Sequence, residues 1–116
     1  MASTRKYDLI VKGIFDELAE IIERQSTPRR DGAETICVRN HEGANFLLVR
    51  YGWRDGHRVR AVSLLVRVRD GKVRIEEDMT DWGVVDRLIG QGVDPEHIIL
   101  AFQRGEPTAA ERMTAR

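Results

Sequence analysis

Two Asp-Gly pairs, each set between runs of alternating residues, constrain the fold of this chain more than any other feature. The pairs are Asp55-Gly56 and Asp70-Gly71. A two-residue hairpin turn that matches the twist of its strands needs positive φ at both central positions, which Asp-Gly adopts readily. The sequence therefore predicts three successive antiparallel strands. They span residues 45–53, 58–69 and 72–77.

The two turns also predict which residues lie opposite one another. Arg69 pairs with Lys72, Val68 with Val73, Arg67 with Arg74, Val66 with Ile75, Trp53 with Arg58, Tyr51 with Arg60, Val49 with Val62 and Leu47 with Leu64. Because side chains alternate across a strand, one face becomes apolar and holds Leu47, Val49, Leu64, Val66, Val68, Val73 and Ile75. This register places Tyr51 and Trp53 on the face opposite the ladder of bases around the second turn.

Residues 4–25 are predicted to form an amphipathic helix that covers this apolar face. Its stripe follows three-and-four spacing and consists of Tyr7, Ile10, Val11, Ile14, Leu18, Ile21 and Ile22. Ser3 or Thr4 would cap the start, and Pro28 would stop any continuation. The core is expected to combine Ile14, Leu18, Val49, Val66 and Val73.

The remaining segments complete the predicted α+β fold. Residues 33–40 form a first strand, and residues 98–102 form a last one. Between them a shorter helix would begin at a Thr80 cap and end at Gly90 or Gly92, and Asp94-Pro95 would open one more short turn. The expected architecture is an antiparallel four- to five-stranded meander sheet, covered by an N-terminal amphipathic helix and a shorter C-terminal helix.

The length of 116 residues favours a single domain. Residues 1–102 are predicted to form that domain, and residues 103–116 a polar, frayed tail, although "TAAE" at 108 has the form of a capping box. No apolar leader opens the sequence, and the lone Cys37 cannot form an intramolecular disulfide. We therefore expect a cytoplasmic protein that crosses no membrane.

One acidic run is the sole candidate for catalytic or metal chemistry. It comprises Glu76, Glu77 and Asp78, with Asp81 close behind. Grouped carboxylates can hold Mg²⁺, yet an acidic run before a helix is also ordinary, because the N-terminal dipole favours negative charge. The three histidines form no local pair of the kind that zinc sites use. The sequence predicts no catalytic residue, no metal and no cofactor.

A ladder of bases is the stronger candidate for a binding surface. It consists of Arg67, Arg69, Lys72 and Arg74, which share the polar face of the second hairpin. Like charges directly opposite each other destabilise a sheet, so Arg67 beside Arg74 needs a neutralising group. Three candidates for this neutralising group remain open: nucleic-acid phosphate, an acidic partner or second subunit, and plain solvent. The net charge of zero favours carboxylates over phosphate.

The order of several motifs resembles the XisI-like family, the excision-controlling factors of the cyanobacterial fdxN element. The motifs are "GW" before the first turn, "DGKV" at the second and "GVDPEHIILAF" near the end, and the resemblance covers roughly residues 5 to 102. It implies an α+β fold and accessory control of site-specific DNA excision beside a XisH-type, nuclease-like partner.

The sequence thus predicts a non-catalytic accessory factor that acts through protein contacts, either with a XisH-like partner or by self-association. The first alternative is a DNA-binding module that uses the ladder directly. The second is a metal-dependent hydrolase built on the acidic run.

Overall fold

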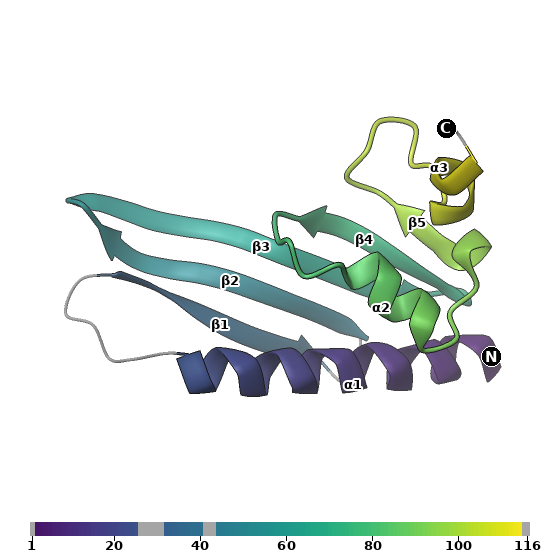
Figure 1. The fold of residues 1–116 in the computed structure, drawn as a ribbon, viewed down its shortest axis with the longest axis horizontal. Coiled ribbons are helices and arrows are strands. Elements are labelled where there is room, and N and C mark those ends of the chain that lie inside the picture. Colours follow the sequence, from purple (N-terminus) through teal and green to yellow (C-terminus); the bar gives the residue numbers. More distant parts are fainter. Residues whose placement is uncertain (1, 26–31, 41–43, 115–116) are drawn as a thin grey trace.

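A five-stranded sheet in the order β1-β2-β3-β4-β5 forms the body of the protein (Figure 1). The computed structural model describes residues 2–25, 32–40 and 44–114. The strands are β1 (Gly32–Asn40), β2 (Asn45–Arg54), β3 (His57–Arg69), β4 (Lys72–Asp78) and β5 (Ile98–Leu100). The first four strands form the predicted antiparallel meander. Strand β5 runs parallel to β4, since a helical crossover rather than a hairpin joins the two.

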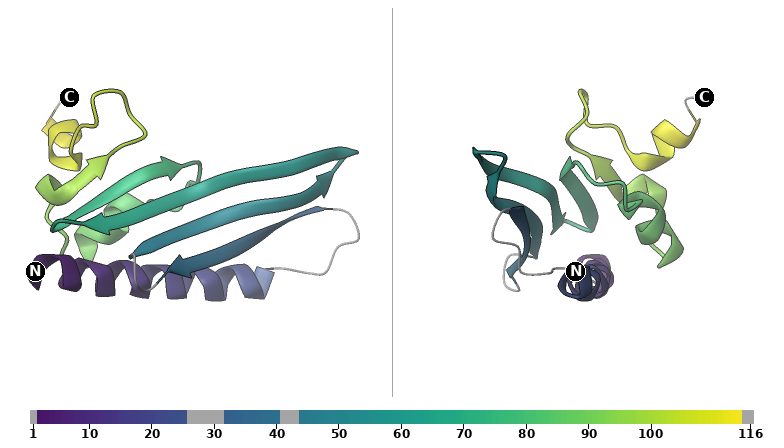
Figure 2. Two further views of the ribbon diagram at one scale, coloured as in Figure 1. Left: turned by 180° about the vertical axis from the view of Figure 1, so that it is seen from behind. Right: turned by 60° about the vertical axis from the view of Figure 1, so that its left-hand side comes forward.

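Two helices cover one face of this sheet, which confirms the α+β prediction. They are α1 (Ala2–Gln25) and α2 (Val84–Gly90), and they lie on the same side of the strands (Figure 2). A short 3-10 turn, η1 (Pro95–His97), leads into β5, and its Asp94 cap accepts a hydrogen bond from the Glu96 amide at 2.9 Å. Helix α1 begins two residues before the predicted start, so Ser3 lies within its first turn. The predicted stop at Pro28 lies outside the described residues.

Both Asp-Gly turns adopt the predicted conformation. The φ angles are 51° and 78° at Asp55 and Gly56, and 53° and 74° at Asp70 and Gly71. All four predicted pairs around the second turn are present, from Arg69 opposite Lys72 to Val66 opposite Ile75. The turn therefore predicts the register of the second hairpin correctly as far as Val66 and Ile75.

The core lies between the helices and the sheet. Its side chains from the sheet and α1 are Tyr7, Val11, Ile14, Phe15, Leu18, Phe46, Leu48, Leu64, Val66, Val68, Val73 and Ile75. Four of the five residues predicted to meet there do so, and Val66 is 0% exposed. The exception is Val49, which is only half-buried. Phe15, absent from the predicted stripe, packs against Phe46 with ring centroids 5.4 Å apart.

A β-bulge in β3 explains why Val49 misses the core. Val49 pairs with Val62 as predicted, but Leu48 pairs with Leu64, which leaves Ser63 as an extra residue between them. The predicted pair of Leu47 with Leu64 is therefore wrong. One extra residue exchanges the two faces of the paired strand, so the odd-numbered residues of β2 point away from the core.

A second bulge lies next to the first, on β4. Val66 pairs with Ile75 but Leu65 pairs with Glu77, so Glu76 is the extra residue. The Met79 amide donates a hydrogen bond to the Ser63 carbonyl at 2.6 Å, which ties the end of β4 to the first bulge. The two irregularities therefore support each other across the β3–β4 pair.

The start of the second helix differs from the prediction. The amide and hydroxyl of Thr80 both donate hydrogen bonds to Asp78 Oδ1, at 2.9 and 2.7 Å. Gly83, with a left-handed φ of 65°, then precedes the first helical residue. Because Thr80 is held in this side-chain turn, helix α2 begins at Val84 rather than directly after Thr80. Its end at Gly90 agrees with the prediction.

The C-terminal segment that the sequence favoured as a frayed tail is structured up to residue 114. It forms a loop and helix α3 (Ala109–Thr114), in which Ala109 is buried. Thr108 forms an isolated bridge with Ile99 of β5. The predicted capping box is present, since the Thr108 hydroxyl accepts a hydrogen bond from the Glu111 amide at 3.1 Å and the Glu111 carboxylate accepts one from the Thr108 amide at 3.4 Å.

Candidate interaction surface

The sheet face opposite α1 and α2, here called the outer face, is the main candidate for function. Residues that pair directly across strands share a face, which defines its members. They are Gly32, Glu34, Ile36, Val38 and Asn40 of β1; Asn45, Leu47, Val49, Tyr51 and Trp53 of β2; Arg58, Arg60, Val62, Leu65, Arg67 and Arg69 of β3; and Lys72, Arg74 and Glu77 of β4. Neither α1 nor α2 covers these positions (Figure 2).

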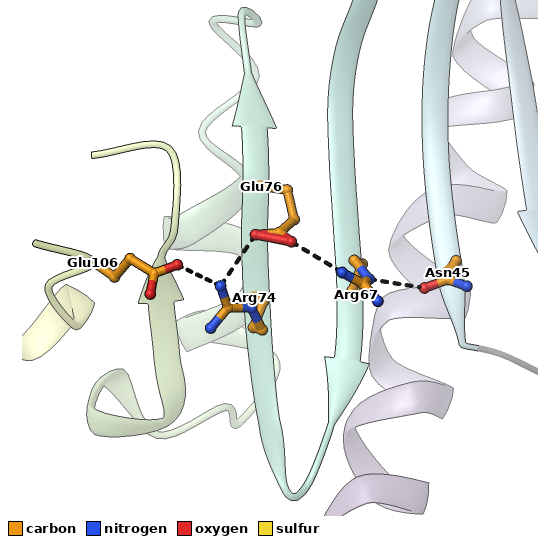
Figure 3. Close-up of polar contacts among 5 residues, drawn as sticks. All are labelled: Asn45, Arg67, Arg74, Glu76 and Glu106. Atoms are coloured by element: carbon orange, nitrogen blue, oxygen red, sulfur yellow. Dashed lines mark hydrogen bonds and ion pairs between the residues drawn. The ribbon is translucent and has the colours of Figure 1, made fainter. Parts of the chain in front are cut away.

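Two bases of the predicted ladder are neutralised within the chain (Figure 3). Glu76 lies between them, with its carboxylate 3.1 Å from Arg67 Nη1 and 3.3 Å from Arg74 Nη2. Glu106, from the loop after β5, reaches Arg74 Nη2 at 2.5 Å. Arg67 also donates a hydrogen bond from Nε to Asn45 Oδ1 at 3.3 Å. The hydrogen bond to Glu106, together with the charge of Glu76, raises the pKa of Arg74.

The other two bases of the ladder lie at the turn. Arg69 and Lys72 are both exposed and face each other across the hairpin. No carboxylate within the described part of the chain forms an ion pair with either. The ladder is therefore divided into an internally neutralised half and a half that can meet an external anion.

An apolar strip crosses the middle of the outer face. We define it by its six members: Ile36, Val38, Leu47, Val49, Val62 and Leu65. Ile36, Val38 and Val62 are 45%, 42% and 40% exposed, and the other three are half-buried. A contiguous group of this kind on a sheet surface is typical of an interaction site.

Two exposed aromatic side chains extend the strip toward the first hairpin turn. Tyr51 is 42% and Trp53 56% exposed. The Arg58 guanidinium carbon lies 4.9 Å from the Tyr51 ring centroid and 5.4 Å from that of Trp53, within the range of a cation–π contact. The prediction that these aromatics and the ladder lie on opposite faces is wrong, because the Ser63 bulge brings them onto one face.

The acidic run does not form a metal-binding group. Glu76 is held by two arginines, and Asp78 accepts the hydrogen bonds of Thr80. Across residues 2–25, 32–40 and 44–114, no three His, Cys, Asp or Glu side chains are arranged to hold a metal ion. Of the histidines, His97 bonds through Nδ1 to the Tyr7 hydroxyl at 2.7 Å, while His41 lies outside the described residues. No helix in the described ranges is long and apolar enough to cross a membrane.

Comparison with known proteins places this architecture in a family. The model of the XisI protein family matches residues 1–112. The chain belongs to the XisI family. The match includes most of α3, beyond the region covered by the motifs in the sequence. No curated protein matches the chain.

Two solved structures share the fold. The fdxN element excision controlling factor XisI from Anabaena variabilis ATCC 29413 superposes with a TM-score of 0.72 at 24% identity, over 88% of each chain. A XisI-like protein from the same organism also gives a TM-score of 0.72, at 23% identity, over 86% of this chain and 87% of the other. The sheet with its helix-covered face is thus the fold of the XisI family.

Proposed function

We propose that this XisI-family chain is a non-catalytic accessory factor in the control of site-specific DNA excision, and that it acts through protein contacts. The observation that carries the proposal is the outer face, where an apolar strip not covered by α1 or α2 lies beside two bases that form no ion pair within the described residues. Family membership and the excision-controlling role named for one solved relative support the context. Two of the four carboxylates in the acidic run are instead engaged: Glu76 by Arg67 and Arg74, and Asp78 by Thr80.

The exposed half of the ladder fits a protein partner with acidic groups. Arg69 and Lys72 lie together at the tip of the second hairpin, while the chain as a whole carries no net charge. Charge at the rim of an interface mainly steers the encounter and selects the partner. We take the partner to be a XisH-like, nuclease-related protein with a carboxylate-rich surface.

Co-purification with the XisH-like protein of the host tests this proposal. The variant Arg69→Glu with Lys72→Glu should lose the partner, because two attractive contacts become repulsive. The variant Arg5→Glu with Lys6→Glu is the matched control: it makes the same charge change on α1, where both residues are exposed. Partner recovery that is equal for both variants and the wild type would exclude the ladder from the contact. Failure of the wild type to retain any such partner would contradict the proposed function itself.

Direct DNA binding by the ladder is the second candidate, and one observation favours it. Tyr51 and Trp53 share the outer face with the bases, and exposed aromatics beside arginines can stack unpaired nucleotides. Phosphate contacts make affinity fall with salt by about 0.9 in log–log slope for each phosphate neutralised in duplex DNA. If Arg69 and Lys72 contact phosphate, replacing both by Ala should flatten that slope by about two. An unchanged slope would favour protein contact.

A further inference from the structure

We propose that a second copy of this chain packs its own outer face against the apolar strip, around a two-fold axis that runs along β2. The occupant of the strip is thus an identical chain, and the assembly is a sandwich of two sheets. Self-association of this kind does not depend on a role in DNA excision.

The first support is the position and exposure of the apolar side chains. Strand β2 lies between β1 and β3, and the strip spreads over all three strands. Ile36 and Val62 flank Val49 in one row, and Val38 and Leu65 flank Leu47 in the next. Two such faces can interdigitate as the inner faces of a β-sandwich do, with strands aligned to within about 30°.

The second support is the distribution of charge across the three strands. One row further along, Glu34 of β1 and Arg60 of β3 flank Tyr51 on either side. They stand two strands apart, about 10 Å between backbones, with Tyr51 between them, and they form no ion pair with each other in the described chain. On the outer face, β1 carries the acid and β3 the base. Arg39, the other charged residue described in β1, instead pairs with Asp16 of α1.

A two-fold axis parallel to β2 turns this distribution into complementarity. It lays β1 of each copy over β3 of the other and keeps the rows in step. Ile36 then meets Val62, and Val38 meets Leu65. Glu34 meets Arg60 twice, once at each side of the axis. An axis perpendicular to the strands would lay β3 over β3 and bring arginines together, so charge selects the first arrangement.

The arrangement also leaves room for the rest of the face. Strand β4 lies beyond β3, so in the sandwich it extends past the free β1 edge of the second copy. The loop that carries Glu106 is farther out still, where it contacts Arg74. Lys72, which belongs to β4, therefore stays accessible in the dimer.

A charge-reversal experiment tests both the surface and the axis. The wild-type chain should have the mass of a dimer by sedimentation equilibrium at about 100 µM, and Glu34→Arg and Arg60→Glu should each raise the dissociation constant at least about tenfold. Mixing the two single variants should restore dimerisation, because both crossing pairs are then of opposite charge. The double variant E34R/R60E should dimerise like the wild type.

A second pair of variants separates the surface from the fold. Val49→Lys should give a folded monomer, whereas Leu9→Lys should remain a dimer, because Leu9 is 61% exposed on α1 and far from the outer face. A monomeric wild type at about 100 µM would overturn the proposal. Dimerisation that survives Val49→Lys, or single variants that fail to complement each other, would overturn it equally.

Discussion

Arg67 lies directly opposite Arg74 on neighbouring antiparallel strands, and the carboxylate of Glu76 bonds to both (Figure 3). Like charges in this position repel, so Glu76 makes the pair tolerable. Glu76→Gln should lower the free energy of unfolding by about 1 kcal/mol, since the three side chains are only partly exposed. The loss should shrink with added salt, because screening weakens the repulsion that remains.

Glu77→Gln is the control for that prediction. Glu77 is the next residue on β4 and is also half-buried, but it forms no ion pair within the described residues. Urea unfolding of both variants at low and high salt gives the comparison. Equal, salt-independent effects would mean that Glu76 does not neutralise the ladder.

The Ser63 bulge yields a test on two adjacent leucines. Leu48 is buried at 1% exposure, whereas Leu47 points to the outer face and is half-buried. Leu48→Ala should destabilise the fold by about 2–5 kcal/mol through lost burial and a cavity. Leu47→Ala should cost less than about 1.5 kcal/mol. Denaturant unfolding of dilute protein measures both, and the reverse order would mean that the two faces of β2 are exchanged.

Local signals in the sequence predicted the hairpins but not the bulge. Positive φ at Asp-Gly is a property of two residues, so the strand ends and nearby pairs followed from it. Residues 46–49 read Phe-Leu-Leu-Val, apolar at every position. Such a run fits either face equally well. Packing against α1, and against its Phe15 in particular, decides which face of the strand is buried. That contact leaves no periodic pattern in the sequence of a single strand.

The candidate site, like the fold, was predictable from the sequence only in part. The pairing of Arg67 with Arg74 followed from the second turn. Alternation along the strand also puts Glu76 on the face of Arg74, a signal that could have identified Glu76 as the neutralising group. Glu106 could not be found, since it reaches Arg74 from 32 residues away through the fold of the C-terminal loop. The face on which Tyr51 lies was predicted wrongly, because the Ser63 bulge exchanges the two faces between the second turn and the row of Tyr51.

Glycine at position 52 is required by a close approach between strands. An added Cβ would lie 2.9 Å from the Gly32 carbonyl oxygen and 3.1 Å from the Ala33 Cα, and φ at Gly52 is 144°. Gly52→Ala should therefore push β1 away and destabilise the fold by about 1–3 kcal/mol.

Gly13→Ala is the control for Gly52→Ala, and its expected effect on stability has the opposite sign. Gly13 lies within α1, and nothing stands within 4 Å of the Cβ it would gain. This variant should stabilise the protein by about 0.4–1 kcal/mol, because alanine favours the helix and restricts the unfolded chain. Thermal unfolding followed by circular dichroism distinguishes the two signs. Equal shifts in Tm for both variants would contradict the close contact at Gly52.

Cys37 gives a prediction on pH. It pairs with Leu48 on the inner face of β1 and packs against the core, and burial raises the pKa of its thiol. Below the pKa of the unfolded thiol, about 8.5, both states keep the proton and Cys37 adds no pH dependence. Above it the unfolded chain releases the proton first, so stability falls as pH rises through the folded pKa.

The difference in unfolding free energy between wild type and Cys37→Ala should therefore be constant near neutral pH and move against the wild type from about pH 8.5 upward. Urea titrations of both proteins from about pH 7 to pH 10 measure it, and tyrosine and lysine titrations cancel in the difference. A difference that stays flat over this range would mean that the thiol ionises as easily in the folded chain as in the unfolded one.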